Sequence, residues 1–366
     1  MPNAFSKEER VAFETLLEGF QDALVLSKAV ATFNTDSQTM ERARDTIWRP
    51  QPYIAQSFDS TVGTSIASNY DDMVQLSVPA TLGFSKTAAW KLNAKELRDA
   101  LQEGRLGDAA KQKLASDINV AVMNVAATQG TLVVATAGAA GDYDDVALCD
   151  TIMNEQGVPN YDRYLALSSR DYNGLAGNLA ASTRSFGNTK SDKAYERSYV
   201  GMVAGFETYK LDYAQRITAK AGSATIATNG AQVRFVPAST TNSVAGKLNV
   251  DNRFQQVTVS ATAGIVAGDA FTVAGIEAVN HITKLSTGQL KTFRVISVDS
   301  GTTMTISPPM IGANSSPTDA ELSYKNINVA STSATAAIVF LNQNATSINP
   351  FWQKDAIEIL PGRYAV

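Results

Sequence analysis

The chain has 366 residues and a net charge of −4, and 18% of its residues are charged, against about 25% in an average soluble domain. Its single histidine and single cysteine, His281 and Cys149, exclude a disulfide framework and a structural zinc site made of Cys and His ligands. A hydrophobic fraction of 44% excludes a disordered chain, and the slight acidic excess offers no basic groove for nucleic acid. The length predicts two or three domains.

The first ten residues are polar and charged, which is not the pattern of a secretory signal. The most apolar stretch, residues 118–127, is interrupted by Asn119 and Asn124 and is too short to span a bilayer. We therefore expect no membrane partner, and a cytosolic or virion location.

Residues 1–46 begin with the capping-box spacing of Ser6 and Glu9. Behind this cap, apolar residues recur at helical spacing: Phe13, Leu16, Leu17, Phe20 and Leu24. The pattern predicts a helix, which is either a core helix or an arm that docks on a neighbouring subunit.

Residues 47–86 have a different pattern. Prolines at 50 and 52 break a helix, and the alternation of Val74, Leu76 and Val78 with polar residues predicts a strand. A polar stretch from Ser57 to Asp72 separates it from the preceding extended segment. We expect a long two-stranded ribbon with little core of its own, or an ordinary hairpin packed on its own domain.

A long helix is predicted next. Asn93 and Glu96 form a cap pair, Gly104 and Gly107 interrupt the pattern, and residues 108–129 run without glycine or proline. At about 1.5 Å per residue this helix is roughly 30 Å long, the length of a spine. Residues 131–134 read as a strand, and residues 145–211 mix helix and strand signals, as in an α+β domain.

The segment after residue 222 changes in composition. Residues 223–349 contain 7 Lys/Arg and 6 Asp/Glu, about 10% charged, against about 22% in the rest of the chain. Short alternating runs separated by turn signals predict a small antiparallel barrel inserted into the α+β domain; these runs contain Val233/Phe235, Val257/Val259, Phe271/Val273, Phe293/Val295 and Met304/Ile306. The two ends of such an insertion should lie close together.

The side chains of most catalytic mechanisms are missing. A Ser/His/Asp triad would need His281, which lies within the predicted barrel, and Cys149 has the surroundings of a small buried hydrophobe. Asp142, Asp144 and Asp145 lack a calcium-loop pattern and suit a helix cap better than a metal site. We expect no catalytic residue, no metal and no cofactor.

Several segments resemble the major capsid (coat) proteins of short-tailed double-stranded DNA bacteriophages, in the subgroup with an inserted β-barrel. The similar segments occur in the same order as in that family, over almost the whole chain. They are residues 46–50 (Thr-Ile-Trp-Arg-Pro), 97–99 (Leu-Arg-Asp), 130–133 (Gly-Thr-Leu-Val), 203–206 (Val-Ala-Gly-Phe), 249–254 (Asn-Val-Asp-Asn-Arg-Phe), 257–262, and Phe351-Trp352 with 355–357.

The resemblance implies an α+β chain with the tailed-phage major capsid fold. Its parts would be an N-terminal arm (1–46), an extended loop (47–86), the spine helix and central domain (87–135), an axial/central domain (136–222), the inserted barrel (223–345) and a return to the axial/central domain (346–366). Members of the family continue well beyond the Phe-Trp motif, so the native chain is expected to extend past Val366.

The implied function is that of a shell subunit that assembles with itself into hexamers and pentamers. Its partners would be scaffolding protein, portal protein, a decoration protein and enclosed double-stranded DNA, and it would be assembled in the host cytoplasm. The interface candidates are Phe13, Phe20, Trp48, Tyr53 and Phe58. Three alternatives stay open: a nanocompartment (encapsulin-type) shell protein of the same fold, a carbohydrate-binding or adhesin module, and an enzyme.

Overall fold

The computed structural model describes residues 26–32, 46–55, 57, 73–81, 83–84, 86–88, 100–136, 138–182, 189–211, 213–218, 220, 226–228, 234–244, 246–330, 336–342 and 344–360. The chain divides into two units. Unit 1 comprises residues 1–45, 82–126 and 352–366, and unit 2 comprises residues 46–81 and 127–351. Helices and antiparallel and parallel strands occur together, which makes the chain α+β.

Unit 1 is organised around the long helix α2 (Ala100–Gln129), which continues into unit 2 at its last residues. The 3-10 helix η1 (Leu26–Ala29) lies against it, because the backbone N–H of Leu26 donates to Asn119 Oδ1 at 3.2 Å. Strand β1 (Ala31–Thr32) pairs in parallel with β18 (Glu358–Ile359), which follows the 3-10 helix η4 (Lys354–Ala356). The buried Trp352 indole donates to the Ala29 carbonyl at 2.9 Å, so segments far apart in the sequence close this unit.

The predicted spine is confirmed, with one correction. The helix does not stop at Gly104 and Gly107 but runs through both glycines from Ala100. A glycine costs only about 1 kcal/mol in a helix interior, which thirty residues of continuous backbone hydrogen bonding can absorb. The predicted cap pair Asn93 and Glu96 and the predicted helix behind Ser6 lie outside the described residues.

The α+β part of unit 2 contains α3 (Tyr143–Glu155), β4 (Arg163–Ser168), α4 (Ser169–Ser182), α5 (Thr189–Arg197), β5 (Met202–Val203) and β6 (Phe206–Leu211). Its sheet has the order β17-β4-β6-β5, where β17 (Phe351–Gln353) begins at the last residue of the unit. Strands β4 and β6 are parallel, and helices α3 and α4 pack on them around Leu165, Leu167, Leu175 and Phe206. Residues 131–134, predicted as a strand, form none.

The low-charge segment forms a six-stranded antiparallel sheet of order β11-β14-β13-β12-β15-β8. Its strands are β8 (Ile226–Thr228), β11 (Gln255–Thr258), β12 (Ala270–Val279), β13 (Ser286–Val298), β14 (Thr303–Ser307) and β15 (Ala336–Phe340). Alternate residues of these strands fill one core, which includes Val257, Phe271, Phe293, Ile306 and Phe340. Among the described residues, β11 and β8 stand at the two ends of the strand order, and no closed barrel is found.

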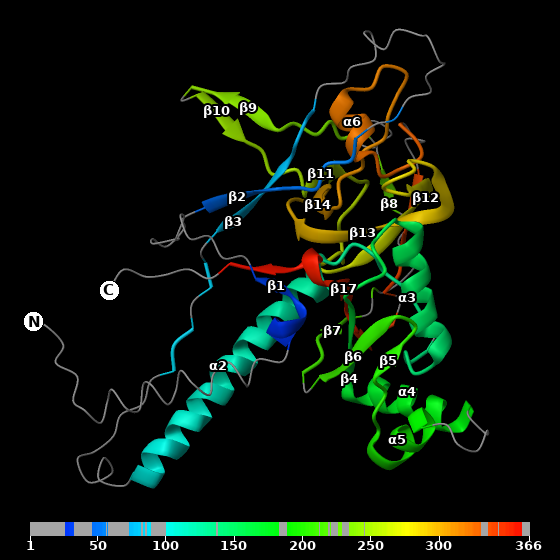
Figure 1. Ribbon diagram of the computed structural model, residues 1–366. Helices are drawn as coiled ribbons and strands as arrows, with labels where there is room; N and C mark the ends of the chain where they lie inside the picture. Colours follow the sequence, from blue (N-terminus) through cyan, green and yellow to red (C-terminus); the bar gives the residue numbers. More distant parts are fainter. Residues whose placement is uncertain are drawn as a thin grey trace, which may run out of the picture. The chain divides into compact units, whose positions relative to one another are not determined.

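Two small pairings complete unit 2. Strand β7 (Arg216–Ile217) pairs with β16 (Thr346–Ser347), so the chain segments that lead into and out of the inserted segment lie side by side. The hairpin of β9 (Thr240–Ser243) and β10 (Gly246–Asn249) projects away from the six-stranded sheet (Figure 1). Helix α6 (Asp319–Tyr324) lies between β14 and β15 in the sequence.

Candidate functional site

The structure shows the base of the predicted ribbon, and most of the loop between its two strands, residues 58–72, lies outside the described residues. Strands β2 (Thr46–Pro50) and β3 (Ser77–Thr81) pair antiparallel, with Trp48 opposite Pro79. Of the five interface candidates, Trp48 lies within β2 and Tyr53 three residues after its end, and both are half-buried. Phe13, Phe20 and Phe58 lie outside the described residues, so the structure brings together only Trp48 and Tyr53, on one short segment. An interface role for any of the five stays a prediction.

The base of the ribbon lies on the inserted segment. Leu76, buried in front of β3, packs on Ile311 and Tyr324 with Val74 and Phe235 at the edge of the cluster. The backbone N–H of Leu76 donates to the Tyr324 hydroxyl at 3.2 Å, while its carbonyl accepts from the Gln51 N–H at 2.8 Å. The ribbon is therefore supported at one end by its own chain.

Helix α6 presents Tyr324 and is itself firmly held. Thr318 caps it, and the fully buried Glu321 accepts the Thr318 N–H at 2.8 Å in a capping box. The Arg234 guanidinium donates to both Glu321 oxygens, with 2.9 Å between Nη2 and Oε2, and this pairing holds the pKa of the carboxyl below its usual range. A bidentate pair of this kind fixes orientation as well as position.

The inserted sheet is joined to two helix ends. Arg294 Nε donates to the Gly130 carbonyl at 3.0 Å and the Thr292 hydroxyl to the Thr131 carbonyl at 2.6 Å, directly after α2. At the end of α3, Lys291 Nζ donates to Gln156 Oε1 at 2.9 Å and Asn280 Nδ2 to the Glu155 carbonyl at 2.9 Å. Two of these four donors, Arg294 and Lys291, are cations, and the partial negative charge at the C-terminus of a helix favours a cation nearby.

Burial lowers the pKa values of two lysines in this part of the inserted segment. The pKa of Lys291 is lowered to about 8 by burial, and that of Lys284 to about 8 by burial and by the charge of Lys325. Burial, with the charges of Lys284 and Lys291, lowers the pKa of His281 to about 4. His281 is therefore neutral at pH 7, because burial and the two nearby lysine charges disfavour protonation of its ring.

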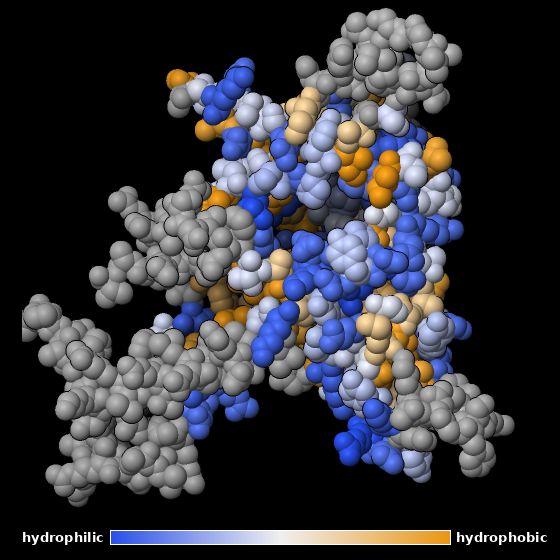
Figure 2. Space-filling view, in the orientation of Figure 1, coloured by the Kyte–Doolittle hydropathy of each residue, from blue (hydrophilic) through white to orange (hydrophobic). Residues whose placement is uncertain are grey.

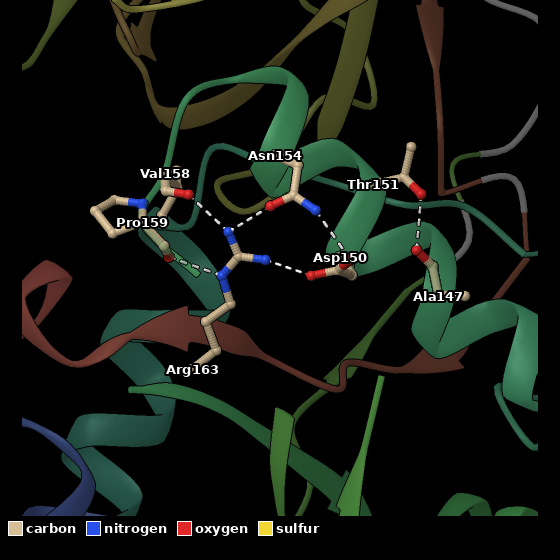
Figure 3. A network of polar contacts seen from close by, with 7 residues as sticks. All are labelled: Ala147, Asp150, Thr151, Asn154, Val158, Pro159 and Arg163. Atoms are coloured by element: carbon tan, nitrogen blue, oxygen red, sulfur yellow. Dashed lines mark hydrogen bonds and ion pairs between the residues drawn. The ribbon is translucent and has the colours of Figure 1, made fainter. Parts of the chain in front are cut away.

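A second buried cation ties α3 to β4 (Figure 3). Arg163, at the start of β4, is inaccessible to solvent and pairs with Asp150 of α3. Its guanidinium also donates to Asn154 Oδ1 at 2.8 Å and to the carbonyls of Val158 and Pro159 at 2.6 and 2.8 Å. Because its donors meet a carboxylate and three neutral acceptors, the buried charge is well compensated.

The β9–β10 hairpin is unlike the rest of unit 2, because all eight of its strand residues are exposed. Val244 at its tip is fully exposed and Leu248 is 54% exposed. Polar and apolar residues occur side by side in this part of the surface (Figure 2). An isolated two-stranded hairpin is only marginally stable in water, so a feature that supports it is expected.

Cys149 and the carboxylates near it, which the sequence analysis weighed for catalysis or metal binding, have structural surroundings. Cys149 packs beside the α3 core, where burial and the Asp145 charge raise its pKa to about 12, which disfavours the reactive thiolate. Asp142 is the N-cap of α3, in a capping box with Asp145. Among the described residues, no group of three or more His, Cys, Asp or Glu could hold a metal ion. In the same part of the chain no helix is long and apolar enough to cross a membrane.

Sequence reasoning missed the residues that hold these parts together: Arg163, Arg234, Lys291, Arg294 and Glu321. One signal was available for the last four, because charges are scarce in residues 223–349. A charged side chain inside an otherwise apolar strand pattern, such as Lys291 and Arg294 around Phe293, indicates a buried partner. Nothing in the sequence around Arg163 indicates its contacts.

A family model described as "P22 coat protein - gene protein 5" matches residues 1–366. Two solved structures are similar to the chain. The CUS-3 coat protein I-domain is 40% identical, with coverage of 33% of this chain and 98% of that chain and a TM-score of 0.27. The capsid structure of the cyanophage P-SCSP1u is 12% identical, with coverage of 93% and 89% and a TM-score of 0.36.

Proposed function

The chain belongs to the P22 coat protein family and is a structural subunit of a bacteriophage capsid, and from this premise we propose how it builds a shell. Many copies assemble as hexamers and pentamers into an icosahedral container that encloses packaged double-stranded DNA. Scaffolding protein, portal protein and a decoration protein are its partners, assembly takes place in the host cytoplasm, and no catalytic step is required of the chain. The family does not favour the encapsulin-type alternative.

The observation that carries the assembly mechanism is the ribbon. It is fixed at its base by Leu76 and Tyr324, while Trp48 and Tyr53 remain half-buried. A two-stranded ribbon has no core, so its outer part gains stability by lying on another surface. We place that surface on neighbouring subunits, where the arm residues Phe13 and Phe20 and the loop residue Phe58 also make contact.

Weak individual contacts suit this task. A standard interface buries apolar area at roughly 25 cal/mol per Å², and the entropy lost on association offsets most of that gain. Subunits that bind incorrectly can therefore dissociate, while closed symmetry multiplies the correct contacts.

The experiment replaces residues 56–72 with a short Gly/Ser linker, which leaves the β2–β3 pairing and the Leu76 contact in place. The variant should give a folded subunit, with the circular dichroism and thermal transition of the native chain, that forms few or no shells in negative-stain electron microscopy. Normal shells from this variant would contradict the assembly role of the loop. Absence of closed shells from the native chain, expressed with scaffold and portal, would contradict the function itself.

We also propose that the inserted sheet closes as an antiparallel barrel. The support is its single continuous core, to which every inner strand contributes. Amide hydrogen exchange tests this: the outward N–H groups of β11 should be protected in a closed barrel. Exchange at the rate of an open edge would reject closure.

A further inference from the structure

The turn between β12 and β13 holds the C-terminal end of α3. Asn280 Nδ2 donates to the Glu155 carbonyl at 2.9 Å, and the backbone N–H of His281 donates to the Gln156 carbonyl at 3.2 Å. These two bonds occupy carbonyls at a helix end, where no intrahelical donor is available. Lys291 Nζ, at the start of the adjoining part of β13, adds a bond to Gln156 Oε1 at 2.9 Å. We call these three hydrogen bonds the α3 contact.

The turn is also closed by hydrogen bonds of its own. Asn280 Oδ1 accepts from the N–H groups of Ile282 and Thr283 at 3.0 Å each, and the Lys284 N–H donates to the Asn280 carbonyl at 2.9 Å. The turn packs closely on the end of α3, because a Cβ atom added at Gly157 would lie 3.3 Å from Asn280 Oδ1. Since its internal bonds do not involve α3, the turn can part from the helix as one unit.

Two cations act on the half-buried ring of His281, Lys284 in the turn and Lys291 on β13. Lys284 Nζ donates to the Ser323 carbonyl at 2.6 Å, near the end of α6, and the charge of Lys325 acts on it in turn. A proton on His281 would therefore add a further positive charge to a partly buried group of cations, which is unfavourable.

The carboxylates of the surrounding elements do not compensate such a charge. The other charged groups on these elements are Asp150 and Glu155 of α3, Arg163 of β4, Glu277 of β12, and Glu321 of α6 with its partner Arg234. Asp150 is paired with Arg163, and Glu277 accepts from two neutral side chains. None of these groups is among the charges that shift the pKa of His281, which burial and the two lysines lower to about 4.

We propose that the α3 contact is an acid-sensitive latch: protonation of His281 opens it, while α3 and the inserted sheet each stay folded. Opening exposes the ring to water, where its pKa returns towards the ordinary value of 6.5. The open state then binds more protons than the closed state between pH 6.5 and 4, so a falling pH favours opening in this window. The inference concerns the subunit itself and does not depend on the proposed shell function.

Hydrogen exchange of the dispersed, full-length subunit tests the latch, read residue by residue and corrected for the intrinsic rate at each pH. The amide of residue 281 reports the α3 contact, and the Val295 amide, which donates to the Asp269 carbonyl at 2.8 Å, reports unfolding of the inserted sheet. Between about pH 6.5 and 5, exchange at residue 281 should accelerate about tenfold relative to Val295. His281→Gln cannot be protonated and should change by less than about twofold. His281→Asn replaces it if the glutamine variant does not fold.

A second variant separates the latch from its proton. Asn280→Ala removes the bond to the Glu155 carbonyl, so exchange at residue 281 should be faster at pH 6.5 and should keep its acceleration towards pH 5. Gln289→Ala, at an exposed position of the same hairpin, is the matched control and should behave as the native chain.

Three results would overturn the inference. The first is an equal pH dependence of the native chain and the neutral variants at residue 281. The second is unchanged exchange in Asn280→Ala. The third is loss of protection at residue 281 and Val295 together, which would mean that acid unfolds the insertion instead of opening the α3 contact.

Discussion

The backbone N–H of Leu76 donates to the side-chain hydroxyl of Tyr324, 248 positions further along the chain, at 3.2 Å in a buried contact. One hydrogen bond thus joins the base of the extended ribbon to helix α6 of the inserted segment. Leu76 adds an apolar contact with the Tyr324 ring and Ile311. The position of the ribbon therefore depends on the fold of the insertion.

Tyr324→Phe should destabilise the subunit by about 1–3 kcal/mol, because it leaves the buried Leu76 N–H without an acceptor. Chemical unfolding followed by fluorescence measures the loss, and hydrogen exchange at the Leu76 amide should accelerate. Tyr195→Phe, at a position that is 85% exposed, is the control and should change stability by less than about 0.5 kcal/mol. Equal stability of Tyr324→Phe and the native chain would show that water replaces the hydroxyl.

Arg163→Met should lower the free energy of unfolding by about 3 kcal/mol, the lower end of the range for breaking a buried ion pair, since Asp150 keeps some contact with water. The change also removes the donors for Asn154 and for two backbone carbonyls. Lys113→Met, which breaks the exposed pair with Asp117 in α2, should cost at most about 0.5 kcal/mol. Denaturant midpoints compare the two, and similar losses would contradict the network's role.

The stability of the chain should rise between pH 7.5 and 9.5. The folded-state pKa of Lys291 is about 8 and that of Lys284 also about 8, below the ordinary value of 10.5, so the unfolded state binds more protons in this window. Above this window, deprotonation of Tyr209, whose pKa is raised to about 12, acts in the opposite sense. Lys291→Met should flatten the rise, as measured by urea unfolding at several pH values. An unchanged slope in this variant would assign the effect to other groups.

His281 offers a direct observation, because it is the only histidine. Its imidazole proton resonance should titrate with a pKa of about 4 in the folded chain, against an ordinary value of 6.5. A lowered pKa means that the stability contributed by the neutral ring is present above pH 6.5 and is lost as the pH falls towards 4. Titration of the folded chain near pH 6.5 would show that the ring is exposed to water.

The β5–β6 turn contains a strained residue. Ala204 has a φ of +45° and is followed by Gly205 at +81°, which are the left-handed values of a type I′ hairpin turn. Ala204→Gly should stabilise the chain by up to about 1 kcal/mol, because it relieves the positive φ. The same substitution at Ala147, inside α3, should destabilise it by about 1 kcal/mol. Thermal unfolding of both variants checks the opposite signs, and a loss at Ala204 would contradict the turn assignment.

The sequence predicted elements wherever a periodic pattern is long. The structure contains the spine helix, the base of the ribbon and the strands that contain Val257, Phe271, Phe293 and Met304. These elements were predictable because many residues are buried at alternate or helical spacing, which gives the sequence a periodic pattern of apolar residues. Residues 131–134 were predicted wrongly as a strand. Their apolar character is real, but the Thr131 carbonyl accepts from the Thr292 side chain instead of joining a ladder.

The contacts between elements were not predictable in the same way. The pairing of Arg163 with Asp150 and of Arg234 with Glu321 depends on which chain segments the fold brings together, and a single sequence has no periodic signal for that. The β9–β10 hairpin also escaped prediction, because its strands are four residues long and are exposed on both faces. A pattern of burial cannot reveal a strand that buries nothing within its own subunit.

The buried indole of Trp352 reaches the carbonyl of Ala29 across 323 positions, and this contact has a consequence for synthesis. At translation rates of about 5–20 residues per second, the ribosome needs on the order of 10–45 s after completing α2 to add the segment that closes unit 1. During this interval the insertion is made and can fold, while the partner of the Ala29 carbonyl has not yet been synthesised. A nascent chain therefore cannot complete unit 1 until Trp352 has been added, so the order of synthesis lets the insertion fold before unit 1 does.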